Sequence, residues 1–298
     1  MKVLIVASEL MPYISSGILG KSVQNMVISP HEDVEVEAVL PFYSFIDEKL
    51  YDIKKTDTGF SVPVGEKTEN AEIWKGRHPV SGSTVWFVSN KYFERDGLYG
   101  NITGDYPDNA ERFVFFARAV LELALTIIKP TIVHCNDWQA SLIPVYLKEV
   151  YEKEKISRGI KTLLSIHDIR YQGRFWLYDL CILNLGWDIF SPEKLEYYND
   201  LNFLKGGIVY SDAILTVNED YFNDISTAEY GCGLEGVVSQ FKNKVFPVCQ
   251  NGQNLYLEDP VTSSLGKNLS AIYKKIMHGY SPCSTADSAN TKNVRDVV

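Results

Sequence analysis

The residues Lys2-Val3-Leu4-Ile5-Val6-Ala7-Ser8 form a nearly uninterrupted apolar run of the kind that a fully buried parallel strand shows. The run breaks at Pro12, and a loop containing Gly17 and Gly20 follows. The segment from Lys21 to Val27 is then typical of a helix. A buried strand, a glycine loop and a helix at the beginning of the numbering predict the centre of a doubly wound sheet, where ligands bind beyond the carboxyl ends of the strands.

The glycine loop does not carry the fingerprint of a dinucleotide site. Gly17 and Gly20 are its only glycines, so no GxGxxG motif is present. This stretch alone leaves two interpretations open: a loop that meets an anionic ligand, or an ordinary turn between strand and helix that binds nothing.

The composition is typical of a soluble globular protein, with 45% hydrophobic and 22% charged residues in a chain of 298. The net charge of -9 argues against nucleic acid as a partner, because phosphate binding needs a basic face. No apolar run is long enough for a membrane span, so we expect no membrane association. The five cysteines show no CxxC pairing and no export signal precedes the first strand, which favours the reducing cytoplasm.

Strand and helix patterns alternate along the rest of the chain. Asp108 is the expected N-cap of one helix, and Pro192 lies in the first turn of another. The alternation predicts an α/β fold with a doubly wound, mostly parallel, Rossmann-like sheet and right-handed crossovers. Strands are predicted at 34–41, 59–64, 71–76, 83–89, 131–135, 161–166, 213–217 and 245–249, and helices at 108–124, 140–155, 191–209, 219–226 and 269–276.

Two predicted strands end in residues that can carry chemistry. Asp137 follows the strand at 131–135, and His167 follows the strand at 161–166. Both belong on the same rim as the Gly17 loop, because all three follow parallel strands, and together they make a candidate polar site. Two simpler interpretations stay open: Asp137 as the N-cap of the next helix, and His167 as a core histidine bonded to backbone. No histidine pair has the HxH or HExxH spacing, so no metal site is predicted.

Two further stretches allow both a structural and a functional interpretation. Gly231 and Gly233 belong to a glycine-dense run, which fits a tight turn before a helix or a loop beside a cleft. Lys205 falls within a mostly apolar predicted helix, shortly after Asn202. It is either a snorkelling lysine or a residue that lines the cleft.

Five longer stretches occur in a recognisable order along the chain. They read YFERDGLYG at 92–100, DYPDNAERF at 105–113, HCNDWQ at 134–139, HDIRYQGRF at 167–175, and a segment at 202–238 that contains NFLKGG and EYGCGLEGV. Together they resemble the N-terminal, starch-synthase catalytic domain of bacterial glycogen synthases and plant starch synthases, and the likeness covers residues 1 to 252. Members of this family are GT-B glycosyltransferases, in which two doubly wound domains face each other across a cleft.

The resemblance implies a retaining transfer of glucose from ADP-glucose to an α-1,4-glucan, without a metal ion or any other cofactor. It implies that Asp137 and His167 are catalytic and lie near the transferred glucose. Three more groups of site residues follow from it: the donor loop Ser15, Ser16, Gly17 and Ile18; the rings Tyr92, Tyr99, Trp138 and Tyr171 for stacking on the acceptor glucan; and the structural or cleft-lining residues Asn202, Lys205, Gly231 and Gly233.

The donor loop departs from the family pattern, which reads K-[TS]-G-G-L-x-D. Ser15 stands in place of the lysine, Ile18 in place of the second glycine and Lys21 in place of the aspartate. Because a branched side chain obstructs close approach of the backbone and disfavours positive φ, we expect weakened donor binding. Asp168 also stands where the family has asparagine.

The family's hinge signature NGID appears here as Asn251-Gly252-Gln253-Asn254, and few residues follow it. We therefore expect a single GT-B N-terminal domain at 1–252, a remnant of the hinge with a short helix at 253–280, a disordered tail at 281–298, and no second GT-B domain. Such a synthase is incomplete, and needs a separate GT-B C-terminal domain or self-association. The alternative is a catalytically degenerate module that binds α-glucan or scaffolds an active synthase.

Overall fold

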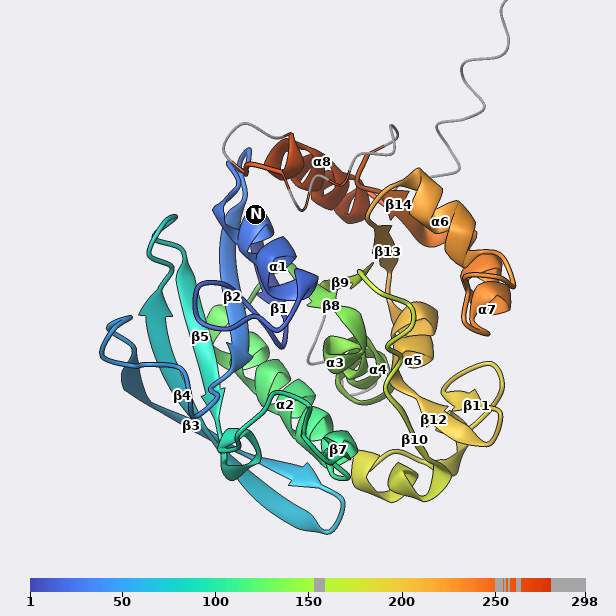
Figure 1. Cartoon of the computed structure of the whole chain (residues 1–298), viewed down its shortest axis with the longest axis horizontal. Coiled ribbons are helices and arrows are strands. Elements are labelled where there is room, and N and C mark those ends of the chain that lie inside the picture. Colours follow the sequence, from blue (N-terminus) through green and yellow to red (C-terminus); the bar gives the residue numbers. More distant parts are fainter. Residues whose placement is uncertain (153–158, 250–253, 255, 257, 261–263, 280–298) are drawn as a thin grey trace, which may run out of the picture.

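The computed structural model describes residues 1–152, 159–249, 254, 256, 258–260 and 264–279. Within them, a sheet of nine strands runs through the centre of the molecule (Figure 1). Its strands are β1 (Lys2–Val6), β2 (Glu35–Pro41), β3 (Lys54–Val64), β4 (Lys67–Arg77), β5 (Thr84–Ser89), β8 (Ile132–Asn136), β9 (Lys161–Ile166), β13 (Ala213–Thr216) and β14 (Val245–Pro247). Their order is β14-β13-β9-β8-β1-β2-β5-β4-β3, which confirms that the first stretch of sequence lies at the centre of the sheet.

Seven neighbouring strands, from β14 to β5, are parallel, and β4 and β3 extend the sheet as an antiparallel ribbon. Val3 of β1 lies between Val36 of β2 and Ile132 of β8. The side chains of Val3 to Val6 are completely buried, as expected for a strand covered on both faces. In the ribbon, buried and exposed residues alternate, so one of its faces meets solvent.

Helices flank the sheet in two groups (Figure 1). In one group α1 packs against α8; in the other, α4 packs against both α2 and α5. The helices are α1 (Ile18–Ile28), α2 (Asn109–Leu123), α3 (Asp137–Ala140), α4 (Leu142–Tyr146), α5 (Phe203–Tyr210), α6 (Glu219–Ile225), α7 (Glu235–Gln240) and α8 (Leu265–Met277). Short π-helical turns follow α2 and α4, so the segment predicted as one helix at 140–155 is instead divided.

The predicted helix at 191–209 is wrong over its first half. That segment contains β11 (Glu196–Tyr197) and β12 (Asp200–Asn202), which form a small sheet with β10 (Arg174–Trp176) in the order β10-β12-β11. Tyr198 and Asn199 both take positive φ, which turns the chain between β11 and β12 and prevents a helix there. Only α5, from Phe203, is helical.

Asp108 occupies the predicted N-cap position, but its side chain does not cap the helix. Asp108 directly precedes α2, yet its side chain makes no capping hydrogen bond. Its carboxylate instead forms a two-pronged ion pair with the guanidinium group of Arg95. The carboxylate of Asp108 therefore stabilises the loop before α2 rather than the N-terminus of the helix.

Helix α8 is longer than the predicted segment at 269–276, and it is part of the folded domain. Its buried face includes Leu269 and Tyr273, and the Tyr273 hydroxyl contacts Nδ1 of His134 in β8 at 2.8 Å. Residues 251–253 of the predicted hinge signature at 251–254, and the predicted tail at 281–298, lie outside the described residues. Among the described helices, none combines the length and the apolar character needed to cross a membrane.

Candidate active site at the carboxyl ends of the strands

A cleft with a cavity volume of about 800 Å³ opens at the carboxyl ends of β1, β8 and β9. Its wall includes Gly17 from the loop after β1, Asp137 from the end of β8 and His167 from the end of β9. The sequence predicts that these three places share one rim, and the structure confirms that placement. The cleft therefore has the position in which open parallel sheets bind ligands.

Asp137 lies at the base of this cleft in an unusual backbone conformation, with a φ of 54°. Its Oδ1 accepts the backbone N–H of His167 at 2.8 Å, so it does not act as the N-cap of α3. Burial raises the pKa of the carboxyl group to about 7, although the backbone N–H groups of His167 and Asp168 oppose that rise. A carboxyl group with this pKa can hold or release a proton near neutral pH.

The imidazole of His167 is oriented by Asn136, the last residue of β8. The amide nitrogen of Asn136 donates to the carbonyl oxygens of Val6 and His134, which points its Oδ1 at Nε2 of His167, 2.9 Å away. Nε2 of His167 therefore carries the hydrogen, and Nδ1 is the acceptor nitrogen. Burial lowers the pKa of His167 to about 4, so the ring is neutral at pH 7.

Glu9 is a functional candidate that the sequence analysis missed. It follows β1 almost directly, lines the cleft and is 3% exposed. Its carboxylate accepts the backbone N–H of Ser16 at 2.6 Å, the Ser16 hydroxyl at 2.8 Å and the Tyr99 hydroxyl at 2.7 Å. The sequence does contain a signal for Glu9: an acidic residue just beyond a buried strand lies at the edge of the sheet where a ligand is predicted to bind.

The donor loop meets the cleft through Ser16, Gly17 and Ile18, but Ser15 is not part of the wall. Ser15 instead donates its hydroxyl to the carbonyl oxygen of Gly17 at 2.8 Å. Gly17 has an extended backbone, with a φ of -168°, and Ile18 is the first residue of α1. Neither position needs the positive φ that a glycine would supply. The side chain of Ile18 is 61% exposed beside the cleft, so it obstructs approach to the loop by its bulk alone.

Three of the predicted aromatic residues line the cleft: Tyr99, Trp138 and Tyr171. Tyr171 is 64% exposed, whereas the ring of Trp138 is largely covered and packs against Phe113 at a centroid distance of 4.8 Å. The backbone of Gly173 crosses this indole ring with a φ of 62°, and a Cβ at Gly173 would lie 2.4 Å from the Trp138 ring. Glycine at that position is therefore what allows the loop to cover Trp138.

Comparison with known proteins agrees with this geometry. The family model described as the starch synthase catalytic domain matches residues 2–240. The chain belongs to the starch synthase catalytic domain family.

Curated relatives that match this chain are named glycogen synthase. The protein of Rhodopirellula baltica is 37% identical over 246 residues, which cover 78% of this chain and 48% of the relative. The protein of Caldicellulosiruptor bescii is 37% identical over 277 residues, which cover 89% of this chain and 55% of the relative. The chain thus spans about half the length of the curated relatives it matches.

A solved structure with the same fold is the catalytic domain of starch synthase IV from Arabidopsis thaliana, bound to ADP and acarbose. It is 26% identical in sequence, with a TM-score of 0.74, and the match covers 85% of this chain and 52% of that one.

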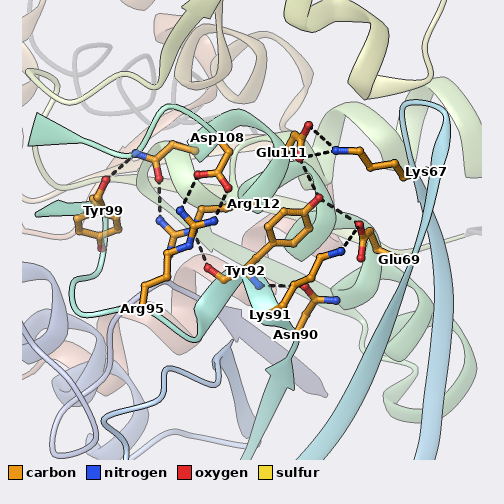
Figure 2. Close-up of polar contacts among 11 residues, drawn as sticks. Lys67, Glu69, Asn90, Lys91, Tyr92, Arg95, Tyr99, Asp108, Glu111 and Arg112 are labelled. Atoms are coloured by element: carbon orange, nitrogen blue, oxygen red, sulfur yellow. Dashed lines mark hydrogen bonds and ion pairs between the residues drawn. The ribbon is translucent and has the colours of Figure 1, made fainter.

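Tyr92 is not available for stacking on a ligand, which corrects the prediction made for it. Its ring is 4% exposed and packs against Phe115, and it is not part of the cleft wall. Its hydroxyl donates to Glu111 at 2.9 Å, and Glu111 also pairs with Lys67 (Figure 2). Tyr92 is therefore a structural residue between α2 and the antiparallel ribbon.

Arg112 of α2 supports the cleft wall from behind, and the sequence analysis did not identify it. Its fully buried guanidinium group donates from Nε to the Tyr92 carbonyl at 2.9 Å and from Nη1 to Oδ1 of Asn109 at 2.7 Å (Figure 2). Asn109 then donates to the carbonyl oxygen of Tyr99 at 2.7 Å. Since Asn109 and Tyr99 both line the cleft, Arg112 holds two parts of its wall together.

Two more predicted residues have structural positions behind the wall. The amide nitrogen of Asn202 donates to Oε1 of Gln172, a cleft residue, at 2.7 Å, and its Oδ1 caps α5. Lys205 does not snorkel: its ammonium group is buried and donates to the carbonyl oxygens of Pro192, at 2.6 Å, and of Glu196. These bonds hold the turns before α5 in place.

Gly231 and Gly233 flank the cleft without forming its wall, since Cys232 between them is the lining residue. Gly233 has a φ of 84°, and a Cβ there would collide with the Tyr197 hydroxyl. Among the described residues, no group of three or more His, Cys, Asp and Glu side chains is arranged to hold a metal ion.

Proposed function

We propose that this domain is part of a retaining glucosyltransferase that transfers glucose from ADP-glucose to an α-1,4-glucan. The observation that carries the proposal is the joined pair of Asp137 and His167 at the base of the cleft. The names of the curated relatives, and the ADP and acarbose bound to the similar starch synthase IV, support the same reaction class.

Each group at the base of the cleft has a distinct task in this proposal. The neutral His167 accepts a hydrogen bond from a sugar hydroxyl at Nδ1, because Nε2 is committed to Asn136. Asp137 orients the sugar and balances the positive charge that develops on its ring as the nucleotide leaves. Trp138 and Tyr171 present ring surface to the acceptor.

The backbone around Gly17 approaches the donor in this proposal, and no cofactor other than the donor takes part. Ile18 restricts that approach, so donor binding by this wall is weak. Most contacts to the nucleotide then come from a second GT-B domain, supplied by the same polypeptide or by another. The alternative is a domain that binds glucan but never binds the donor.

Calorimetric titration of the chain with maltoheptaose and, separately, with ADP-glucose tests the proposal. We expect maltoheptaose to bind, and Tyr171→Ala to weaken that binding about tenfold, because exposed ring surface in the cleft is lost. Tyr198→Ala, which changes an exposed tyrosine outside the cleft wall, is the matched control and leaves the affinity unchanged. A chain that binds neither ligand refutes the proposal, and measurable binding of ADP-glucose rules out a module that binds only glucan.

A further inference from the structure

The strongly exposed tyrosines and tryptophans are not scattered over the surface. Among the described residues, those more than half exposed all fall between 171 and 230: Tyr171, Trp176, Tyr178, Trp187, Tyr198 and Tyr230. The first of them, Tyr171, lines the cleft. Exposed rings with a polar edge are typical of surfaces that bind a partner or ligand, because such rings lose little entropy on binding.

Trp176 and Tyr178 form one contact pair within this region. Their ring centroids are 4.4 Å apart with an interplanar angle of 56°, while the side chains remain 64% and 56% exposed. Two large rings that support each other and still face solvent make a preformed apolar surface. We call this contact pair the ring pair.

The ring pair continues from the wall of the cleft. Arg174 and Trp176 lie two residues apart on β10, so their side chains point to the same face of the small sheet. Arg174 and Phe175 line the cleft, whereas Trp176 and Tyr178 lie beyond it. The ring pair therefore lies next to the cleft wall, and Trp176 shares its face of β10 with the cleft residue Arg174.

Charged groups lie beside the ring pair on the same face. Nη2 of Arg174 pairs with Asp200 at 2.7 Å, and both side chains keep substantial exposure. Asp200 is also the residue of β12 directly opposite Trp176. The combination of apolar ring surface with exposed donors and acceptors fits a sugar unit, which has a C–H face and a rim of hydroxyl groups. A lipid surface or an apolar peptide would leave the ion pair desolvated without compensation.

We propose that the ring pair, with Arg174 and Asp200, binds glucose units of an α-glucan chain outside the cleft. This inference rests on the proposed function, which supplies the identity of the ligand. It adds a second place of contact that extends the glucan track over the β10-β12 face. Short oligosaccharides that fill only the cleft do not reach it.

The test compares maltose with maltoheptaose as ligands of the whole chain in calorimetric titrations. In the double variant Trp176→Ala/Tyr178→Ala, we expect the affinity for maltoheptaose to fall about tenfold and the affinity for maltose to stay the same. Phe45→Ala is the matched control, because Phe45 is 43% exposed and stacks on the Tyr43 ring at 5.5 Å, beyond the end of β2. This control keeps both affinities. Tyr178→Ala alone gives a smaller loss in the same direction, should the double variant fail to fold.

Four outcomes overturn the inference. Unchanged maltoheptaose affinity in the double variant, with a wild type that binds glucan, overturns it while leaving the proposed function intact. An equal loss for both sugars shows that the ring pair acts on the cleft rather than beyond it. Lost self-association in sedimentation, with unchanged glucan affinity, makes the ring pair a protein contact instead. A wild type that binds no glucan removes both the inference and the proposed function.

Discussion

The backbone N–H of His167 donates to the side-chain oxygen Oδ1 of Asp137 at 2.8 Å, which ties the end of β9 to the end of β8. The bond joins the ends of two adjacent parallel strands, and α3 and α4 lie between these strands in the sequence. It fixes a buried carboxyl group in the base of the cleft at a place where the backbone of Asp137 takes a φ of 54°. Chemistry at this carboxyl group and the stability of the sheet are therefore linked.

The buried carboxyl group of Asp137 should make stability depend on pH. Its pKa is raised from 3.8 to about 7 in the folded state, so between these values the folded protein keeps a proton that the unfolded chain has lost. Raising the pH within this window therefore lowers the stability of the wild type relative to Asp137→Asn, by at most about 1.4 kcal/mol per pH unit. Urea unfolding of both proteins at pH 5 and pH 7 measures the difference.

The control for that experiment is Asp57→Asn, since Asp57 is exposed on β3. We expect the free energies of unfolding of this variant and the wild type to differ by the same amount at both pH values. A gap between wild type and Asp137→Asn that does not change with pH would contradict the assignment of a proton to Asp137.

The loop over Trp138 depends on glycine at position 173. Gly173→Ala places a Cβ 2.4 Å from the indole ring and strains a backbone with a φ of 62°. We expect a loss of roughly 1–3 kcal/mol in unfolding free energy together with weaker binding of maltoheptaose, because Trp138 must move into the cleft. Gly82→Ala also changes a glycine with positive φ, but no atom lies within 4 Å of the added Cβ. Equal loss of glucan affinity in both variants would exclude the proposed effect on Trp138.

The buried guanidinium group of Arg112 should contribute more to the free energy of unfolding than that of Arg95. Both contact the Tyr106 ring, at 5.1 Å and 4.8 Å, but Arg112 is fully buried whereas Arg95 remains partly exposed. Arg112→Lys removes the guanidinium group that donates to the Tyr92 carbonyl and to Asn109. We expect the free energy of unfolding to fall by roughly 1.5–3 kcal/mol.

The matched change, Arg95→Lys, alters a partly exposed ion pair with Asp108 and should cost only about 0–1 kcal/mol. Thermal or urea unfolding of the two variants gives the comparison. Similar costs would mean that Arg112 does not hold the cleft wall through its buried hydrogen bonds.

Helix α8 is attached to the sheet by a buried histidine. His134 contacts Ser165 at 2.6 Å and Tyr273 at 2.8 Å, and burial lowers its pKa to about 3. Tyr273→Phe leaves a buried ring nitrogen without its partner, so we expect a loss of roughly 1–3 kcal/mol in unfolding free energy. Tyr198→Phe removes a hydroxyl from a side chain that is 78% exposed and should have almost no effect. Equal effects would show that α8 adds little to the domain.

The donor loop can be tested by restoring the residues expected from the family pattern. Ser15, Ile18 and Lys21 are all exposed, so the combined variant Ser15→Lys/Ile18→Gly/Lys21→Asp should fold. We expect it to bind ADP-glucose more tightly than the wild type, because the branched side chain beside Gly17 is gone. Titration calorimetry measures this gain. An unchanged donor affinity would show that the loop is not what limits donor binding.

The position of the site was predictable because it follows from a rule about parallel strands. Asp137 and His167 end neighbouring parallel strands, and the structure brings both to the rim that holds Gly17. Their catalytic roles stay predictions. A sequence motif does not give the direction of a side chain, so the motifs could not show which aromatic rings face the cleft. For this reason Tyr92 was assigned to the ligand although it lies in the core.

The missed and misassigned features depend on contacts between distant parts of the chain. Glu9 shows its importance only through Ser16 and through Tyr99, which lies far away in the sequence. The predicted helix at 191–209 had a suitable composition, but the ammonium group of Lys205 holds the carbonyl oxygens of Pro192 and Glu196 in turns instead. Local patterns do not contain such partners.

The charged groups of the cleft wall affect which kind of ligand can bind against it. Its wall carries four carboxyl groups and two guanidinium groups: Glu9, Asp105, Asp137, Asp168, Arg170 and Arg174. Both guanidinium groups already face carboxylates, in Asp168 and Asp200. A diphosphate pressed against this wall would meet a surplus of like charge, whereas an uncharged, hydroxyl-rich ring would find acceptors for its protons. The charges of this wall therefore favour an uncharged, hydroxyl-rich ligand over an anionic one.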